Sequence, residues 1–230
     1  MRLPAEWERQ SGVMLTWPDE TTPWYELEKV QECYGRIISA ILRFEKVLLV
    51  TADIKAVTKR LTELGVDTSK IQFQECPIND TCIPVVAAKA FRGGHKGAGP
   101  VGVDAAPFQD ERTHIHAHHL VGECPVKEYL LGDSVVEIRG GKPYRLVPLP
   151  KPEQMFLDDY PLPASYANFL ITNGAVLVPG SGSELDEVAR TRLQEVFPDR
   201  EVIVIDCRPL LSGHGGLHCV TMQYPEGWLE

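Results

Sequence analysis

Residues 166–206, YANFLITNGAVLVPGSGSELDEVARTRLQEVFPDREVIVID, decide the fold because four elements can be read along them in order. We predict a strand over 166–173, a tight turn at Asn173-Gly174 and a second strand over 175–179. A helix over 183–197 and a strand over 201–206 follow, and Ser183 is a suitable N-cap with acidic residues in the first helical turn. Together these elements make one ββαβ unit.

The N-terminal third alternates strands and helices in the same way. Apolar runs predict strands over 12–17, 46–50 and 71–76. Between them, apolar residues at helical spacing predict helices over 24–43 and 53–64, the second of which ends at Gly65. We therefore assign the chain to the α/β class and expect residues 1–230 to form a single domain.

The central segment 92–125 differs in character from both ends of the chain. Its first part, 92–107, contains five glycines and two prolines with little apolar periodicity, which is typical of a loop. A histidine cluster follows over 114–119. Further along, residues 133–138 and 144–148 are candidate strands.

Composition excludes several classes of protein. With 43% hydrophobic and 24% charged residues, the 230-residue chain is typical of a soluble globular protein. Its net charge of −9 argues against nucleic-acid binding and favours a small cationic ligand. No run of 18 apolar residues or apolar N-terminal segment is present, so we expect a cytoplasmic protein without a membrane partner. The six cysteines are widely spaced, and we expect free thiols.

Several motifs at both ends of the chain occur in the same order in one family of enzymes. The N-terminal motifs are LPAEWE at 3–8, LTWP at 15–18 and ECPINDT at 75–81. The C-terminal motifs are YANFL at 166–170, NGAVLVP at 173–179, IDCR at 205–208 and GGLHCVT at 215–221. On these segments the chain resembles the agmatine deiminases and the Porphyromonas-type peptidylarginine deiminases.

The resemblance implies a pentein fold, an α/β propeller of ββαβ units around a central active site. It also implies an enzyme without a metal or other cofactor that converts agmatine, a small cationic guanidino compound, to N-carbamoylputrescine and ammonia for putrescine and polyamine biosynthesis. Cys219 would be the nucleophile. His114, within DERTHIH at 110–116, would be the general acid and base, and Asp80, Gly216 and His218 would contact the substrate. Homo-oligomer formation is compatible with the family.

The chemistry of this reaction explains the choice of residues. A guanidinium carbon is stabilised by resonance and ammonia is a poor leaving group, so hydrolysis needs a strong nucleophile and a proton donor. The Cys219 thiolate would form a covalent thiouronium, and water activated by His114 would then hydrolyse it. Glycines at 213, 215 and 216 allow the backbone to approach the substrate closely. The sequence leaves open agmatine, free arginine or peptidyl-arginine as the substrate.

Three departures from the family favour an alternative, an inactive remnant. After 79–81 the family continues Trp-x-Arg-Asp-x-Gly-Pro, whereas this chain has CIPVV at 82–86. The Glu-Gly-Gly segment of the family is not recognisable, and typical members are considerably longer. Because the members of a catalytic set do not contribute additively, losing some of them can abolish turnover.

A second alternative is a zinc-dependent hydrolase. A strand over 114–119 would present His114, His116 and His118 on one face, and three neutral imidazoles around an open position suit catalytic zinc. His119, Glu123 or Cys124 could add a ligand. The other motifs of metallohydrolases are not found in the sequence.

Overall fold

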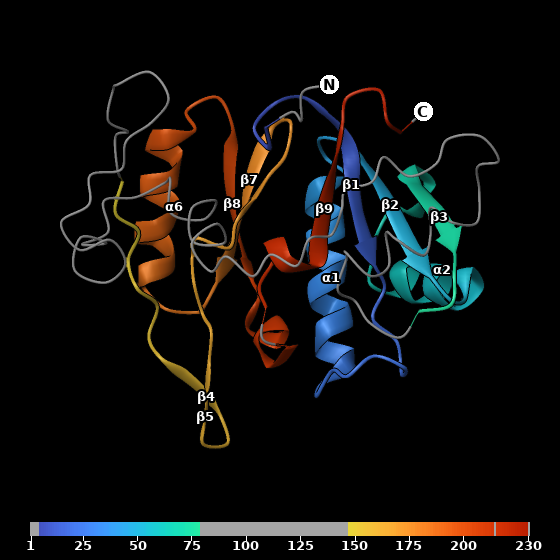
Figure 1. Cartoon of the computed structure of the whole chain (residues 1–230), viewed down its shortest axis with the longest axis horizontal. Helices are drawn as coiled ribbons and strands as arrows, with labels where there is room; N and C mark the ends of the chain where they lie inside the picture. Colours follow the sequence, from blue (N-terminus) through green and yellow to red (C-terminus); the bar gives the residue numbers. More distant parts are fainter. Residues whose placement is uncertain (1–4, 79–146, 214, 230) are drawn as a thin grey trace, which may run out of the picture.

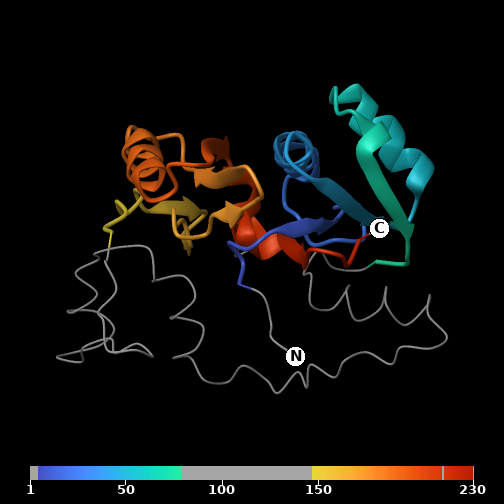
Figure 2. The same ribbon diagram turned by 90° about the horizontal axis from the view of Figure 1, so that it is seen from above.

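Two β-sheets lie on either side of the long helix α1 (Leu27–Ile41) in this computed structural model, which describes residues 5–78, 147–213 and 215–229 (Figure 1). The first sheet is built mainly from the N-terminal part of the chain and the second from the segment 166–206. Viewed from above, the helices follow one another along the same side of the strands (Figure 2).

The first sheet has four strands in the order β3-β2-β1-β9. They are β1 (Gln10–Thr16), β2 (Lys46–Thr51), β3 (Ile71–Glu75) and β9 (Thr221–Pro225). The parallel strands β1, β2 and β3 are connected by α1 and α2 (Ile54–Glu63), whereas β9 runs antiparallel to β1. The predicted alternation of strands and helices in the N-terminal third is confirmed, with ends that differ by at most three residues.

The helix α2 shows why these bounds follow from the sequence. Asp53 caps its N-terminus, since Oδ1 accepts a hydrogen bond from the backbone N–H of Ala56 at 3.0 Å. At the other end Gly65 adopts a φ of 76°, as predicted for a stop at this residue. The N–H of Val66 then reaches the carbonyl of Leu61 at 2.9 Å, which is the hydrogen bond of a Schellman motif.

The segment 166–206 forms the predicted ββαβ unit. Its elements are β6 (Leu170–Ile171), β7 (Ala175–Gly180), α6 (Leu185–Val196) and β8 (Glu201–Asp206). β6 pairs antiparallel with β7, and β7 pairs parallel with β8 in the register Val176 to Val202. The first strand is much shorter than predicted, because residues 166–169 leave the sheet to make contacts described below. The helix begins at Leu185, two residues later than predicted.

The strand β9 gives the N-terminal sheet the same organisation as this unit. In spatial order β9, β1, α1 and β2 repeat the pattern of β6, β7, α6 and β8: an antiparallel strand, a central strand, a helix and a parallel strand. Met14 of β1 faces Met222 of β9 in the ladder. No strand was predicted over residues 221–225, so β9 corrects the expectation from sequence.

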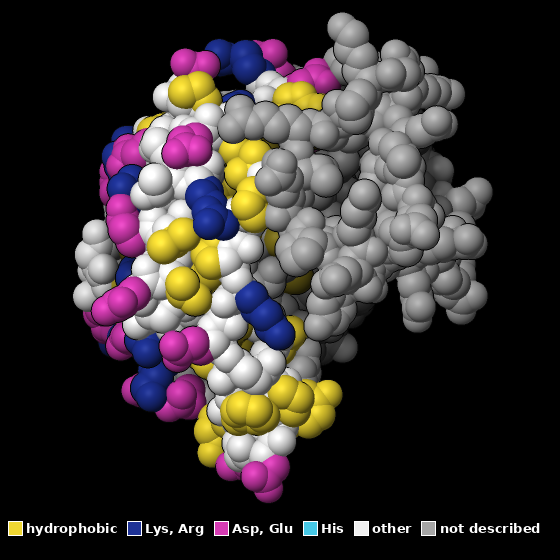
Figure 3. Space-filling model, turned by 90° about the vertical axis from the view of Figure 1, so that its left-hand side faces the viewer, with side chains coloured by type: hydrophobic (Ala, Val, Ile, Leu, Met, Phe, Trp, Pro, Cys, Tyr) yellow, Lys and Arg dark blue, Asp and Glu magenta, His cyan; other side chains and the backbone are white. Residues whose placement is uncertain are grey.

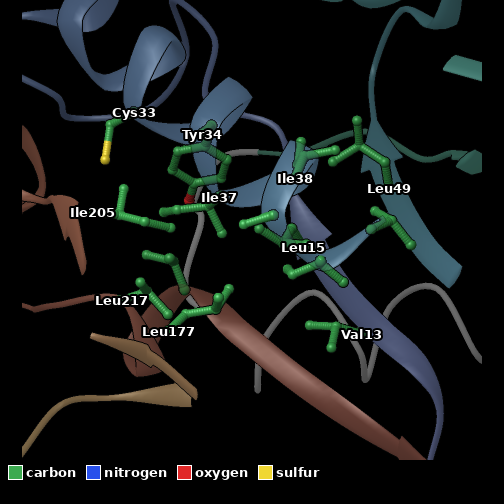
Figure 4. Close-up of a cluster of buried hydrophobic side chains, with 14 of the residues drawn as sticks. Val13, Leu15, Cys33, Tyr34, Ile37, Ile38, Leu49, Leu177, Ile205 and Leu217 are labelled. Atoms are coloured by element: carbon green, nitrogen blue, oxygen red, sulfur yellow. The ribbon is translucent and has the colours of Figure 1, made fainter. Parts of the chain in front are cut away.

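The core is centred on α1. Four of its side chains, Tyr34, Ile37, Ile38 and Ile41, repeat at helical spacing and are fully buried. They contact apolar residues of both sheets, including Leu15, Leu49, Leu177 and Ile205 (Figure 4). Burial of one such side chain contributes about 1.5–3 kcal/mol, so the shared helix is a main reason why the two sheets stay together.

The predicted turn at Asn173-Gly174 is confirmed, and it contacts the first sheet. The side chain of Asn173 accepts a hydrogen bond from the N–H of Gln10 at 3.0 Å and donates one to its carbonyl at 2.8 Å. Gln10 in turn donates from Nε2 to the carbonyl of Ile171 at 2.8 Å. A Cβ on Gly174 would lie 2.4 Å from the ring of Phe44, so any larger residue would have to displace that ring. The turn therefore connects the two sheets as well as β6 and β7.

A hairpin that the sequence analysis did not predict precedes the ββαβ unit. Its strands are β4 (Met155–Leu157) and β5 (Tyr160–Leu162), and Asp158 between them has a φ of 52°. Phe156 and Tyr160 are exposed, and hydrophobic side chains gather around the projecting hairpin (Figure 3).

In the three described ranges, we find no helix with the length and apolar character that a bilayer span requires.

The carboxyl group of Glu45, at the contact between the two sheets, makes stability depend on pH. Oε2 accepts a hydrogen bond from the N–H of Asn173 at 3.3 Å, whereas Oε1 is buried with no hydrogen-bond partner among the described residues. Burial raises the pKa of Glu45 from 4.5 to about 7, against the smaller opposing effect of the Asn173 hydrogen bond. The folded state therefore binds this proton more tightly than the unfolded state does.

We expect the free energy of unfolding to fall as pH rises from 4.5, the ordinary pKa of this group, to about 7, where the folded protein loses the proton. Glu45→Gln should remove this loss. At pH 8 it should stabilise the protein by about 1–2 kcal/mol, a modest amount because the carboxyl is only half-buried. Near pH 4.5 it should have little effect, because the folded protein then holds Glu45 in its neutral form. Chemical denaturation at both pH values, with the exposed Glu153→Gln as control, measures this. Equal effects of Glu45→Gln at both pH values would contradict it.

Candidate functional site

Cys219 lies on a single helical turn, η3 (His218–Val220), between the glycines at 215 and 216 and the strand β9. The thiol is exposed, whereas Leu217 and Val220 on either side of the turn are buried in the core. Thr221, the first residue of β9, donates from Oγ1 to the carbonyl of His218 at 3.0 Å. The turn is thus held in place by the packing of Leu217 and Val220 in the core and by the strand β9 that follows it.

The side chain of Asn168, on the loop that precedes β6, reaches this turn. Its Oδ1 accepts hydrogen bonds from the backbone N–H groups of His218 at 2.7 Å and Cys219 at 3.4 Å. Its Nδ2 donates to the Sγ of Cys219 at 3.1 Å. Because two N–H donors face Oδ1, the amide can take only this orientation. The sequence analysis did not single out Asn168; the signal that could have found it is a polar residue interrupting an otherwise apolar predicted strand.

A chain of hydrogen bonds holds the loop that carries Asn168. The N–H of Asn168 donates to the carbonyl of Ser165, and the hydroxyl of Tyr166 donates to Oδ1 of Asp186 at 2.5 Å. Asp186 also accepts from the N–H groups of Ser181 and Gly182, both at 2.9 Å. Although partial burial raises the pKa of Asp186, these hydrogen bonds together hold it below its usual value. The loop is therefore attached to the start of α6.

Gly216 is buried directly against this amide. A Cβ at this position would lie 2.6 Å from Oδ1 and 2.8 Å from Cγ of Asn168. Gly216 and Asn168 also line a small pocket, together with Ser165 and Cys207. The pocket has a volume of about 10 Å³, which is room for one water molecule. The contact of Gly216 with substrate stays a prediction; the structure shows that its missing side chain makes space for Asn168.

His218 faces a carboxylate from the N-terminal part of the chain. Its Nε2 lies 3.2 Å from both carboxylate oxygens of Glu6, which belongs to the first of the family motifs. The backbone of His218 is held by Asn168, so this residue joins three distant segments around the thiol. Its role in substrate binding stays a prediction.

The four cysteines in the described part of the chain are free, as predicted, and they differ in exposure. Cys33 and Cys207 are buried and close together, and Cys33 Sγ donates to the carbonyl of Asp206 at 3.3 Å. The neighbouring Cys33 thiol and burial raise the pKa of Cys207, which keeps it a protonated thiol. Cys76 is half-buried at the end of β3, and only Cys219 of these four is exposed.

Other predicted site residues lie outside the described ranges. They are Asp80 and His114, together with the alternative zinc ligands His116, His118, His119, Glu123 and Cys124. The pairing of Cys219 with His114 and the zinc alternative therefore stay predictions. Within the described ranges there is no group of three or more His, Cys, Asp or Glu residues that could hold a metal ion.

The model of the Porphyromonas-type peptidyl-arginine deiminase family matches residues 2–89 and 134–225, more than half of the chain. The chain belongs to this family. The resemblance read from the sequence motifs is thereby confirmed, and the two matched ranges contain Asn168, Gly216, His218 and Cys219.

Relatives and solved structures agree with the family assignment. An agmatine deiminase of Stutzerimonas stutzeri is 45% identical over 64 residues, 28% of this chain and 17% of that protein. The chain thus matches less than a fifth of the length of such curated relatives. A Porphyromonas gingivalis protein assigned as an arginine deiminase has a TM-score of 0.74 at 30% identity over 98% of both chains. An agmatine deiminase of C. jejuni has a TM-score of 0.70 at 20% identity, covering 96% of this chain and 95% of that one. At this identity the similarity supports a shared fold only.

For this family member we predict that Gly216→Ala lowers stability. The added methyl group must displace the Asn168 amide, and such overpacking costs about 1–3 kcal/mol, or about 3–10 °C in melting temperature. Gly35→Ala is the matched control, because the nearest atom there is the flexible end of Leu64 at 3.1 Å and alanine favours the helix. Thermal unfolding of both variants tests this prediction. Equal melting temperatures would contradict the tight fit of Gly216 against Asn168.

Proposed function

We propose that this protein is an agmatine deiminase-like hydrolase in which Cys219 is the nucleophile. The observation that carries the proposal is the exposed thiol of Cys219, seated on a glycine-flanked turn with an amide N–H donating to its sulfur. Membership of a deiminase family and the similarity to agmatine deiminases support the reaction class. We also propose that the chain forms a pentein-type α/β propeller of ββαβ units that is incomplete relative to the family.

The proposed reaction has two steps. The thiolate attacks the guanidinium carbon, a C–S bond forms, and the C–N bond breaks as ammonia leaves with a proton supplied by a general acid. His114 is our candidate for that acid on the family resemblance. Water, deprotonated by the same group, then attacks the thiouronium carbon, the C–S bond breaks, and N-carbamoylputrescine is released with the thiolate restored. Water and agmatine thus give one ureido product and ammonia.

Charge supports a cationic substrate. The chain carries a net charge of −9, which attracts small cations at a distance. Near the thiol, the carboxylate of Glu6 faces His218, so the segment next to the nucleophile contributes an acidic group. Asp80 is the candidate to bind the guanidinium directly, in keeping with the family motif that begins at Asn79.

We expect Cys219→Ser to abolish ammonia release from agmatine and to leave folding unchanged. A serine hydroxyl is a far weaker nucleophile without a matched base, and the exposed position leaves no cavity behind. Cys76→Ser is the matched control and should keep the wild-type rate. Ammonia assays and thermal unfolding of both variants measure this.

The contrary outcome is equally specific. If the wild-type chain releases no ammonia from agmatine, arginine or arginyl peptides, and Cys219 alkylates no faster than Cys76, the proposed activity is wrong. The family fold would then persist in a protein without turnover.

A second pair of variants tests the proton donor. His114→Ala should reduce ammonia release by about 100-fold or more, the usual contribution of general acid–base catalysis. His119→Ala, a neighbour without a proposed role in this mechanism, should retain the wild-type rate. Equal activity of both variants would remove His114 from the mechanism, and an equal loss that coincides with loss of a bound zinc equivalent would favour the metal alternative.

A further inference from the structure

We infer that Asn168 is a positioning residue that activates the Cys219 thiol by donating a hydrogen bond to its sulfur, an inference that rests on the proposed role of Cys219. The contact is the Nδ2–Sγ distance of 3.1 Å, which is short for a hydrogen bond to sulfur. An amide N–H is a donor only, so it stabilises the sulfur more when the sulfur carries a negative charge than when it carries a proton. The interaction therefore favours the reactive form.

The two ends of the Asn168 amide perform separate tasks. The first turn of a helix has backbone N–H groups without intrahelical partners, and those of His218 and Cys219 are satisfied by Oδ1. This is a structural task that any acceptor of the same length could perform. The bond from Nδ2 to Sγ is the second task, and it requires a donor.

The surroundings keep the amide in place before any substrate arrives. Gly216 packs against Oδ1 and Cγ, so the side chain is in contact on that side. The carbonyl of Asn168 accepts a second interaction from the N–H of His218 at 3.2 Å, which ties backbone as well as side chain to the turn. Tyr166, two residues earlier, is attached to Asp186 of α6. A donor fixed in this way loses little to reorganisation when charge develops on the sulfur.

The substitution Asn168→Asp separates the two tasks. Aspartate has the same length and keeps the acceptor for the two N–H groups, but it replaces the donor at Sγ with a carboxylate oxygen. Asn168→Ala removes both tasks. Both variants should retain the fold, and Asn168→Asp should melt close to the wild type because the cap of the turn is preserved.

The readout is the rate of alkylation of Cys219 by iodoacetamide as a function of pH, followed by peptide mass spectrometry. For Asn168→Asp we expect this rate to fall about 10- to 100-fold near neutral pH, the size expected for a lost hydrogen bond to a charged group. Cys76 in the same sample is the internal reference and should react unchanged.

Ser165→Asp is the control for added charge. It places a carboxylate on the same loop and can still accept the hydrogen bond that Ser165 Oγ receives from the N–H of Ala167. A smaller fall in the alkylation rate than in Asn168→Asp supports the inference. An equal fall, or an unchanged alkylation rate in Asn168→Asp, overturns it and leaves Asn168 as a purely structural cap.

Alkylation does not depend on turnover, so this inference and the proposed function can fail separately. A profile that depends on Asn168 in a protein that releases no ammonia keeps the inference and rejects the activity. An active protein whose profile is insensitive to Asn168→Asp keeps the activity and rejects the inference. If the inference and the proposed function are both correct, kcat for agmatine should fall in Asn168→Asp with little change in KM. The lost Nδ2–Sγ hydrogen bond acts on the sulfur and not on the bound substrate.

Discussion

The antiparallel pairing of β1 with β9 is the contact on which the rest of the structure depends. It joins the two most distant strands of the described chain, and Met14 lies opposite Met222 in its ladder. The turn that carries Cys219 directly precedes β9, so the position of the thiol is determined by this pairing. The same pairing brings the N-terminal segment with Glu6 to His218. Local sequence around the cysteine alone would not place it in this environment.

The pairing also makes the two sheets equivalent in organisation, and helix α1 then serves both. Its buried face contacts β2 on one side and β7 and β8 on the other. Polar contacts fix the relative position of the two sheets, because the hydrogen bonds between Asn173 and Gln10 can form in only one alignment. An apolar interface tolerates sliding, whereas these bonds select one relative position of the sheets. The distance between Asn168, on the loop before β6, and Cys219, on the turn before β9, depends on that selection.

Much of this arrangement could be predicted from sequence because its causes are local. Asp53 and Gly65 bound a helix by their own chemistry, and Asn173-Gly174 specifies a tight turn wherever it occurs between apolar runs. Residues 221–225 gave no comparable signal, since five residues with weak alternation become a strand only when β1 is available to pair with them. The first strand of the ββαβ unit was predicted too long for a related reason. Residues 166–169 suit a strand, but Tyr166 and Asn168 form hydrogen bonds to side chains and backbone that only the folded chain provides.

The candidate site shows the same division. Cys219, His218 and Gly216 could be predicted as site residues because they belong to a compact motif, and the structure adds that Cys219 is exposed whereas Cys33 and Cys207 are buried. Asn168 was missed because its function is defined by a partner far away in sequence. For Gly216 the sequence predicts contact with a substrate, which stays a prediction, and the structure adds that its missing side chain makes space for the Asn168 amide.

The position of β9 has a consequence for how the protein folds. Contacts between distant segments form late, because a long loop must close before they contribute any stability. The strands and helix of the N-terminal part and the ββαβ unit can form from nearby residues, whereas the pairing of β9 with β1 must wait for both. Until then Cys219 lacks the amide of Asn168 and the turn that holds it. The contacts around the Cys219 thiol therefore depend on a pairing between distant segments, and we expect them to be among the last to form.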